Sequence, residues 1–163
     1  QRKKKLIILV INLLHQEYSK VNIIIFPIFA NSQEIDLYKD DIDKIRYYSH
    51  LNIDSLFHYA RKLEKSENQC VSFIGKNNIA SAYYKSGNFE KSEEIILFVL
   101  SNIKELNSTC NIDNKLLALS RMFWIKNNQR KFDEAFDYLN QKIQLLSNYP
   151  QKNKRYINIY HLL

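Results

Sequence analysis

The four histidines are the first residues to examine for metal or acid–base chemistry: His15, His50, His58 and His161. Zinc sites on helices commonly place two histidines one turn apart, so that both side chains share one face. No pair of histidines in this sequence has that spacing, and a turn-like segment separates the middle two. We therefore expect solvated or packing histidines, and we predict no metal site and no cofactor.

The serines and paired carboxylates also lack a catalytic pattern. No serine stands in the Gly-x-Ser-x-Gly sequence of a nucleophile elbow. Gly75 and Gly87 are the only glycines, which is too few for the glycine-rich loops that bind phosphate groups. Glu93–Glu94 and Asp133–Glu134 lie near the expected starts of helices, where the helix dipole favours negative charge. We predict that the chain is not an enzyme.

The two cysteines, Cys70 and Cys110, occupy similar places in the sequence pattern. Each comes just before the expected first helix of a helical pair. Packed helices lie about 8–10 Å apart, whereas a disulfide needs Cα atoms about 4.4–6.8 Å apart. The sequence therefore leaves open whether the two cysteines are bonded. Neither has the histidine motif that would indicate a catalytic nucleophile.

Helical periodicity dominates the chain after residue 32. Apolar residues recur at steps of three and four, which is the pattern of a helix with one buried face. The stretches with this pattern are 35–45, 53–63, 89–106 and 132–146. No segment alternates apolar and polar residues over a strand's length, and no Asn-Gly or Asp-Gly hairpin signal occurs. The predicted fold class is all-α.

The segment Ile79–Ser92 resembles the centre of a tetratricopeptide repeat. Gly87 can adopt the left-handed conformation that ends a helix, and Asn88 can cap the next one. The small residues Ala80 and Ser92 would let the two helices approach closely, with aromatic side chains filling the remaining space. The resemblance implies a right-handed superhelical array of antiparallel helix pairs.

Neighbouring units match this repeat less well. Leu56, Ser92 and Ala135 recur at spacings of 36 and 43 residues, longer than the ~34 of the common repeat. In the following unit Lys126 takes the place of an aromatic residue, and Arg130 takes the place of the glycine. We predict a repeat domain over residues 33–163, with about three helix pairs and the start of a fourth.

The charge of the chain is unevenly distributed. Residues 1–32 contain five basic residues and one acidic residue, whereas residues 33–163 contain 19 basic and 16 acidic residues. The net charge of +7 therefore belongs largely to the N-terminal segment. A nearly balanced body lacks the basic surface that nucleic acids require, so we predict no direct binding of nucleic acid by this segment.

The N-terminal segment has the parts of a secretory signal. Basic residues Arg2–Lys5 precede two apolar runs, Leu6–Leu14 and Val21–Ala30, and the small-x-small exit Ala30–Ser32 follows. The polar insert His15–Lys20 leaves three readings open: a signal built on the second run alone, an uncleaved membrane anchor, or a hydrophobic helix of the fold. Neither run reaches the ~20 residues that span a bilayer.

We predict that residues 1–32 are a signal peptide or membrane-targeting segment. The protein would then be exported, periplasmic or membrane-anchored, with a cytoplasmic location as the alternative. The chain begins with Gln1 and ends inside the apolar-periodic stretch Arg155–Leu163, so we interpret it as a fragment of a longer protein, truncated at its C-terminus.

The tetratricopeptide resemblance also implies a binding face. In stacked helical hairpins the first helix of each pair lines the concave side. Amide, hydroxyl, aromatic and ammonium groups there suit an extended peptide, because they can bond its backbone and contact its side chains. The residues that the resemblance places on this face are Asn77, Ser81, Tyr84, Lys85, Ser120, Trp124, Asn127 and Asn128.

These features predict a non-catalytic scaffold that binds a protein or peptide. Exported tetratricopeptide-like units at long spacing resemble the sensor region of bacterial membrane-bound signalling or transcription regulators, which implies an effector beyond the repeats. One alternative is a cytoplasmic peptide-responsive regulator, in which the N-terminal apolar runs belong to the fold. A helical enzyme is a further alternative, and it would need a buried polar cluster with perturbed acidity.

Overall fold

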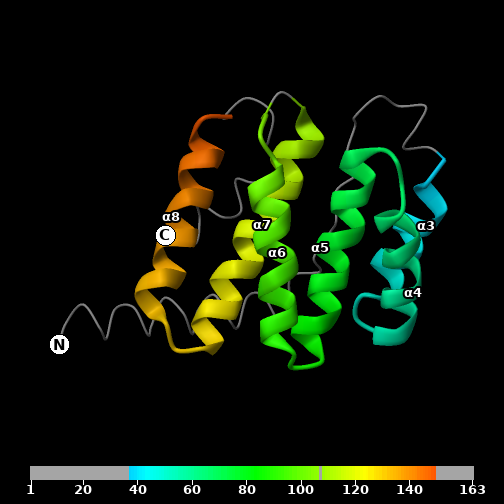
Figure 1. Ribbon diagram of the computed structural model, residues 1–163, viewed down its shortest axis with the longest axis horizontal. Coiled ribbons are helices and arrows are strands. Elements are labelled where there is room, and N and C mark those ends of the chain that lie inside the picture. The colour runs from blue at the N-terminus through cyan, green and yellow to red at the C-terminus, as the bar shows by residue number, and fades with distance from the viewer. Residues whose placement is uncertain (1–36, 107, 150–163) are drawn as a thin grey trace. The chain divides into compact units, whose positions relative to one another are not determined.

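The computed structural model describes residues 37–106 and 108–149, and this part of the chain contains six helices and no strand (Figure 1). The prediction of an all-α fold is confirmed for these residues. The predicted targeting segment and the start of a fourth helix pair lie outside them. The helices are α3 (Lys39–Tyr48), α4 (Ile53–Glu64), α5 (Gln69–Lys85), α6 (Phe89–Asn102), α7 (Thr109–Asn128) and α8 (Phe132–Ser147).

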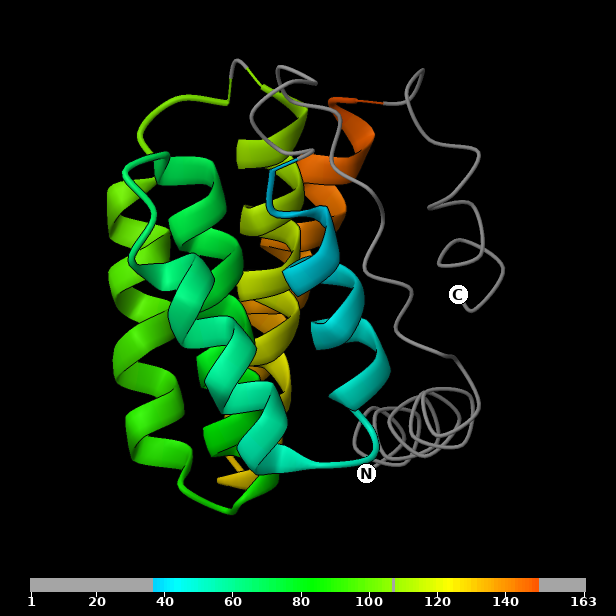
Figure 2. The same cartoon turned by 90° about the vertical axis from the view of Figure 1, so that its right-hand side faces the viewer.

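The six helices pack mainly against their neighbours in the chain. Helices α3 and α4, α5 and α6, and α7 and α8 form antiparallel pairs, and α4–α5 and α6–α7 contacts join each pair to the next (Figures 1 and 2). Helix α5 also contacts α7, which is the first helix of the following pair. This arrangement places the first helices of two pairs side by side.

The turns inside the second and third pairs have the same backbone geometry. The N–H of Gly87 donates to Tyr84 O, and Gly87 has a φ of 81°, as expected from the sequence. The N–H of Arg130 likewise donates to Asn127 O, and Arg130 has a φ of 60°. Both helices therefore end in a left-handed residue, although only one pair has a glycine there. Asn88 caps the helix that follows Gly87, also as expected.

Small residues permit the closest approaches between helices. The hydroxyl of Ser92 donates to Ala80 O over 2.7 Å, so α5 and α6 meet at the two small residues that the sequence indicated. A second close approach joins α4 to α5. A Cβ atom added at Gly75 would lie 2.6 Å from Ala60 O, nearer than real Cβ contacts allow. Gly75 is therefore a packing residue.

One cluster of buried core residues lies between α5, α6 and α7. Its buried members are Phe73, Ala80, Ile96, Val99, Ile103, Ala118, Met122 and Ile125. The third pair departs from the repeat pattern at Lys126, and the ammonium of this lysine is buried. The ammonium of Lys126 is 2.6 Å from Glu93 Oε1 and 2.8 Å from Glu134 Oε2, so it joins α7 to both α6 and α8.

This ion-pair cluster shifts the pKa of its members in opposite directions. Burial raises the pKa of Glu93, but hydrogen bonds from Lys126 and Gln129 outweigh that effect and leave it below its usual value. Burial lowers the pKa of Lys126, and its carboxylate partners more than compensate, so this pKa is raised. The cluster thus keeps its charges, which is typical of a structural ion pair.

Candidate functional site

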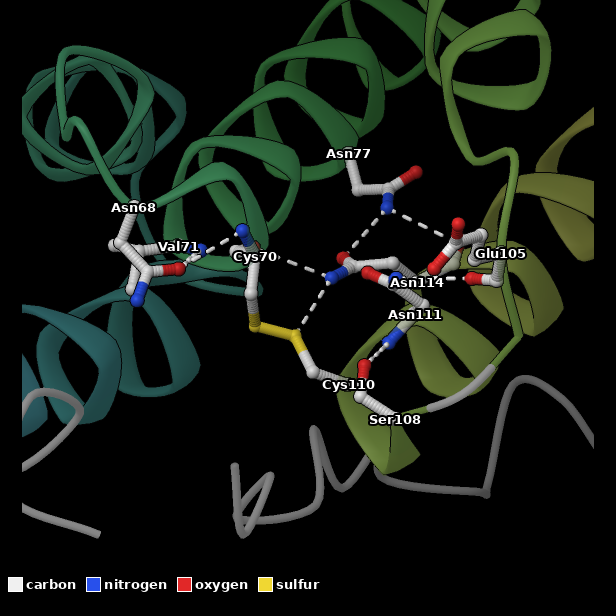
Figure 3. The surroundings of a disulfide bond; sticks show 9 residues. All are labelled: Asn68, Cys70, Val71, Asn77, Glu105, Ser108, Cys110, Asn111 and Asn114. Atoms are coloured by element: carbon white, nitrogen blue, oxygen red, sulfur yellow. Dashed lines mark hydrogen bonds between the residues drawn. A yellow bond between two sulfur atoms is a disulfide. The ribbon is translucent and has the colours of Figure 1, made fainter. Parts of the chain in front are cut away.

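A ladder of side-chain contacts joins α5 to α7 along their length. Its first rung is the disulfide between Cys70 and Cys110, whose Cα atoms lie 6.0 Å apart (Figure 3). Each cysteine is the second residue of its helix, and the N-caps Asn68 and Ser108 precede them at matching positions. The sequence left open whether the two cysteines are bonded. They are bonded in the structure, because the N-terminal ends of α5 and α7 lie next to each other.

The second rung is a pair of buried amides. Asn77 Nδ2 donates to Asn114 Oδ1 over 3.0 Å, and Asn114 Nδ2 donates in turn to Cys70 O and to Cys110 Sγ (Figure 3). The side chain of Asn77 is only 6% exposed. Asn77 therefore lies in the interior between the two helices and not on an open face. The close α5–α7 spacing buries this position.

The third rung is centred on Arg121, which the sequence analysis did not select. Its guanidinium donates to Ser81 Oγ and lies 4.8 Å from the centre of the Tyr84 ring. The hydroxyl of Tyr84 also accepts a hydrogen bond of 2.6 Å from Asn128 Nδ2. Two predicted residues on α5 and one on α7 are thus brought together around an arginine.

Trp124 and Asn128 complete the α7 side of this cluster. Asn128 Nδ2 donates to Trp124 O over 2.9 Å, and the Trp124 ring packs edge-on against Phe123 with centroids 5.0 Å apart. Trp124 is half-buried and Asn128 is exposed. Together with Lys85 at the end of α5, these side chains form a partly exposed patch of the two helices. We call it the α5–α7 surface: Ser81, Tyr84, Lys85, Arg121, Trp124 and Asn128.

Two predicted residues are not joined to this patch by the contacts of the described residues. The hydroxyl of Ser120 donates to Leu116 O within its own helix over 2.8 Å. Asn127 is partly buried, and no hydrogen-bond donor reaches its Oδ1 within the described part of the chain. Both lie on α7, about one turn from Trp124. They make fewer contacts with the patch than Arg121 does.

The α3–α4 connection lies beside the α5–α7 surface. The ammonium of Lys85 donates to Ser49 O, which follows the last residue of α3. His50 is the next residue, and it is exposed. The loop of the first helix pair thus extends the patch past the end of α5.

Burial and neighbouring charges shift the pKa values of several groups in this region. Burial and the charge of Arg121 lower the pKa of the Lys85 ammonium. Burial and the charge of Lys85 lower the pKa of His50. Burial raises the pKa of the Tyr84 hydroxyl, with opposing contributions from Arg121 and Asn128. The charge of Arg121 therefore acts on Lys85, and the charge of Lys85 acts on His50.

The interval between the two cysteines could have identified Arg121 in the sequence as a residue that faces α5. Cys110 follows Cys70 by 40 residues, and Arg121 follows Ser81 by the same interval. Aligning the two helices from their N-terminal ends would have matched those pairs. The turn residues Gly87 and Arg130 give a spacing of 43 instead, because α7 is longer than α5.

The groups on the α5–α7 surface suit noncovalent contacts. It offers a guanidinium, an ammonium, an amide, two hydroxyls and two aromatic rings, and none of these forms a nucleophile–base pair in the contacts described above. Residues 37–106 and 108–149 contain no group of three histidine, cysteine or acidic side chains that could hold a metal ion. None of the helices in these ranges is both long and apolar enough to cross a membrane.

Comparison with known proteins gives no relative for this chain. No protein-family model, no curated protein and no solved structure matches it. The functional interpretation consequently depends on the geometry of the described residues alone.

Proposed function

We propose that this chain is a non-catalytic scaffold of tetratricopeptide-like helix pairs that binds a peptide or an extended protein segment at the α5–α7 surface. The observation that carries the proposal is the joining of Ser81, Tyr84, Asn128 and Arg121 into one connected patch. Side chains that hold each other in place lose little conformational entropy when a partner binds. Fixed aromatic and amide groups also suit backbone and side-chain contacts with a peptide.

Trp124 and Tyr84 are the expected anchors of the bound segment. Tryptophan, tyrosine and arginine dominate binding energy at protein interfaces when they stand at the centre of a contact surface. In this chain all three residue types lie on two neighbouring helices, within a few turns of one another. That grouping favours peptide binding over a merely solvated helix face.

The proposal includes export of the protein, as the sensor part of a larger regulator. The disulfide between Cys70 and Cys110 supports this, because disulfides persist in oxidising compartments and are rare in the reducing cytosol. The cytoplasmic peptide-responsive regulator remains the competing hypothesis. Expression with the native leader in a Gram-negative host separates them: export predicts an oxidised periplasmic protein, and a reduced cytosolic protein with an intact N-terminus favours the competitor.

The binding proposal is tested by selecting peptides from a displayed random 12-residue library against the purified protein. Selected peptides are then synthesised, and binding is followed by the fluorescence of Trp124, the only tryptophan of the chain. We expect a saturable change in this emission on binding. Tyr84→Ala should weaken binding at least tenfold, because it removes a ring that Arg121 and Asn128 hold in position.

The matched control is Tyr47→Ala, which removes an exposed tyrosine from α3 and should leave affinity unchanged. Circular dichroism checks that both variants keep their helicity. Failure to select any peptide that binds saturably would contradict the proposed function. Equal loss of affinity in both variants would move the binding site away from the α5–α7 surface.

A further inference from the structure

We propose that the disulfide between Cys70 and Cys110 is a thiol-exchange site, at which a low-molecular-weight thiol attacks Cys70 and Cys110 leaves as the thiolate. The bond joins the N-terminal ends of α5 and α7, whereas the α5–α7 surface lies toward their C-terminal ends. The inference therefore goes beyond peptide binding, and either can fail while the other stands.

The two bonded cysteines differ in their exposure to solvent. Cys110 is fully buried, with an exposed fraction of 0%, whereas Cys70 is partly exposed. A disulfide is cleaved when a thiolate attacks one of its sulfur atoms, and access decides which sulfur is attacked. A thiol from solvent therefore approaches from the Cys70 side, and the partial exposure favours a small thiol over one carried by a folded protein. Attack at Cys70 makes Cys110 the leaving group.

The buried amide of Asn114 is positioned to stabilise the sulfur that leaves. Its Nδ2 lies 3.3 Å from Cys110 Sγ and also donates to Cys70 O, while its Oδ1 accepts a hydrogen bond of 3.0 Å from Asn77 Nδ2 (Figure 3). Both ends of the amide are engaged, so its orientation is fixed before the bond breaks. A hydrogen bond to sulfur becomes stronger once the sulfur carries a negative charge. Asn114 therefore favours departure of the Cys110 thiolate.

The N-terminal ends of two helices act on the same bond. Each cysteine is the second residue of its helix, where the positive end of the helix dipole stabilises a thiolate. Neither α5 nor α7 has an acidic residue in its first turn, whereas α3, α4, α6 and α8 each have at least one. No carboxylate from the first turn of either helix therefore offsets this stabilisation.

The exchange takes place in two steps. First, the external thiolate forms a bond to Cys70 Sγ, the disulfide breaks, and its electron pair goes to Cys110 Sγ. Next, a second external thiolate attacks the external sulfur of the mixed disulfide, and Cys70 leaves as a thiolate. Two external thiols are thereby oxidised to one disulfide, and the protein disulfide is reduced. The two protons of the external thiols end on the two cysteines.

Reduction of the native protein by dithiothreitol tests whether exchange occurs in the folded state. Samples are quenched with acid at intervals, and their free thiols are labelled and counted by mass spectrometry. We expect a rate that stays within twofold when urea is added below the unfolding transition. If the bond were reached only after unfolding, the rate would rise exponentially with urea concentration, because unfolding exposes surface to the denaturant. Such a rise would overturn the inference.

Single-cysteine variants test which sulfur is reached, because forming a mixed disulfide needs the same access as cleaving it. Cys110→Ser leaves Cys70 as a thiol, and Cys70→Ser leaves Cys110. We expect oxidised glutathione to modify Cys70 at least tenfold faster than Cys110 in the folded variants, as followed by intact mass. In guanidinium chloride the two rates should agree within twofold, and circular dichroism checks the helicity of both variants. Equal rates in the folded variants, or a faster reaction of Cys110, would contradict attack at Cys70.

The role of the leaving-group donor is tested with Asn114→Ala. This variant should slow reduction by dithiothreitol at least fivefold, because the Cys110 thiolate loses its amide donor. Asn78→Ala is the matched control: Asn78 is also a buried asparagine, but its Nδ2 donates to Ile74 O within α5. Its rate should stay within twofold of the native rate. Equal slowing in both variants, or faster reduction of Asn114→Ala, would remove Asn114 from the exchange.

A thiolate titration separates stabilisation of the leaving group from a loss of packing. The ultraviolet absorbance of the Cys110 thiolate is followed against pH in Cys70→Ser, with and without Asn114→Ala. We expect the thiolate to form at higher pH when the amide is absent, because a hydrogen bond to the charged form favours that form. An unchanged titration would contradict the assignment of Asn114 as the donor.

Discussion

Arg130 differs in residue type from its counterpart Gly87 but shares its left-handed backbone. The two φ values are 60° and 81°, and each residue follows the C-cap of the first helix in its pair. For a residue with a side chain, this conformation costs about 1–2 kcal/mol. The helix hydrogen bonds and packing of the third pair therefore impose a geometry that the local sequence disfavours.

Opposite substitutions at these two turns, one to glycine and one from glycine, give a matched pair of stability measurements. Arg130→Gly should raise the free energy of unfolding by about 0.5–1 kcal/mol, because the strain is relieved. Gly87→Ala should lower it by about 1 kcal/mol, since nothing lies within 4 Å of an added Cβ atom and only the backbone is strained. Denaturant unfolding measures both. A destabilised Arg130→Gly variant would contradict this interpretation of the turn.

Lys142 also departs from the repeat pattern, and like Lys126 it does so at a buried position. It lies 43 residues after the core residue Val99, the same interval that separates Ser92 from Ala135. Its side chain is 8% exposed, and burial lowers its pKa to about 8. The folded state thus holds this ammonium less readily than the unfolded state does.

Replacing this lysine by an apolar residue should stabilise the protein at neutral pH. Lys142→Met is expected to raise the free energy of unfolding by about 1–3 kcal/mol at pH 7, because it removes the cost of a buried charge. The unfolded state binds more protons between pH 8 and 10.5, so the stability of the native chain rises with pH there. The difference between the two proteins should shrink from pH 7 to pH 9.5. A constant difference would contradict the pKa assignment.

At the scale of helices, the contact between α4 and α5 depends on Gly75. Glycine inside a helix is unfavourable by about 1 kcal/mol relative to alanine, so propensity alone predicts that Gly75→Ala stabilises the protein. The added Cβ would lie 2.6 Å from Ala60 O, however, and backbone atoms cannot move aside cheaply. The two effects have opposite signs, which makes the outcome diagnostic.

We expect the cost of overpacking to exceed the gain in helix propensity at this position. Gly75→Ala should lower the free energy of unfolding by about 2–3 kcal/mol, because overpacking at a helix contact forces backbone shifts. Thermal or denaturant unfolding followed by circular dichroism measures the change. Stabilisation by about 1 kcal/mol would mean that the two helices lie farther apart than the structure places them.

The disulfide between Cys70 and Cys110 is the strongest link between α5 and α7. It closes a loop with a sequence separation of 40 residues, and a disulfide of this kind typically contributes about 2–4 kcal/mol. Replacing both cysteines by serine should lower the free energy of unfolding by that amount. Reduction of the native protein with dithiothreitol should reproduce the effect. An unchanged unfolding midpoint after reduction would mean that the bond does not stabilise the fold.

At the scale of the whole molecule, the sequence predicted the features that depend on local pattern. Apolar periodicity indicated the helices, and Gly87 with Asn88 marked the turn between α5 and α6. The contact between Ala80 and Ser92 was also predictable, because both residues belong to the one well-matched repeat. These signals lie within a single helix pair.

The parts that escaped prediction depend on how one pair is positioned against the next. Asn77 was predicted on an open face but is buried against Asn114, and Arg121 was not selected at all. Both outcomes follow from the register of α5 against α7, which has an interval of 40 residues at the disulfide and 43 at the turns. The apolar periodicity of one helix pair does not indicate how its helices align with those of the next pair.

The central claim is that a peptide binds at the α5–α7 surface, and amide chemical-shift mapping with a selected peptide tests it most directly. The 19.5 kDa chain is small enough for this measurement by NMR. We predict that the largest shifts fall on Ser81–Lys85 of α5 and Arg121–Asn128 of α7. Shifts concentrated instead around the exposed Leu97 and Phe98 of α6 would contradict the claim.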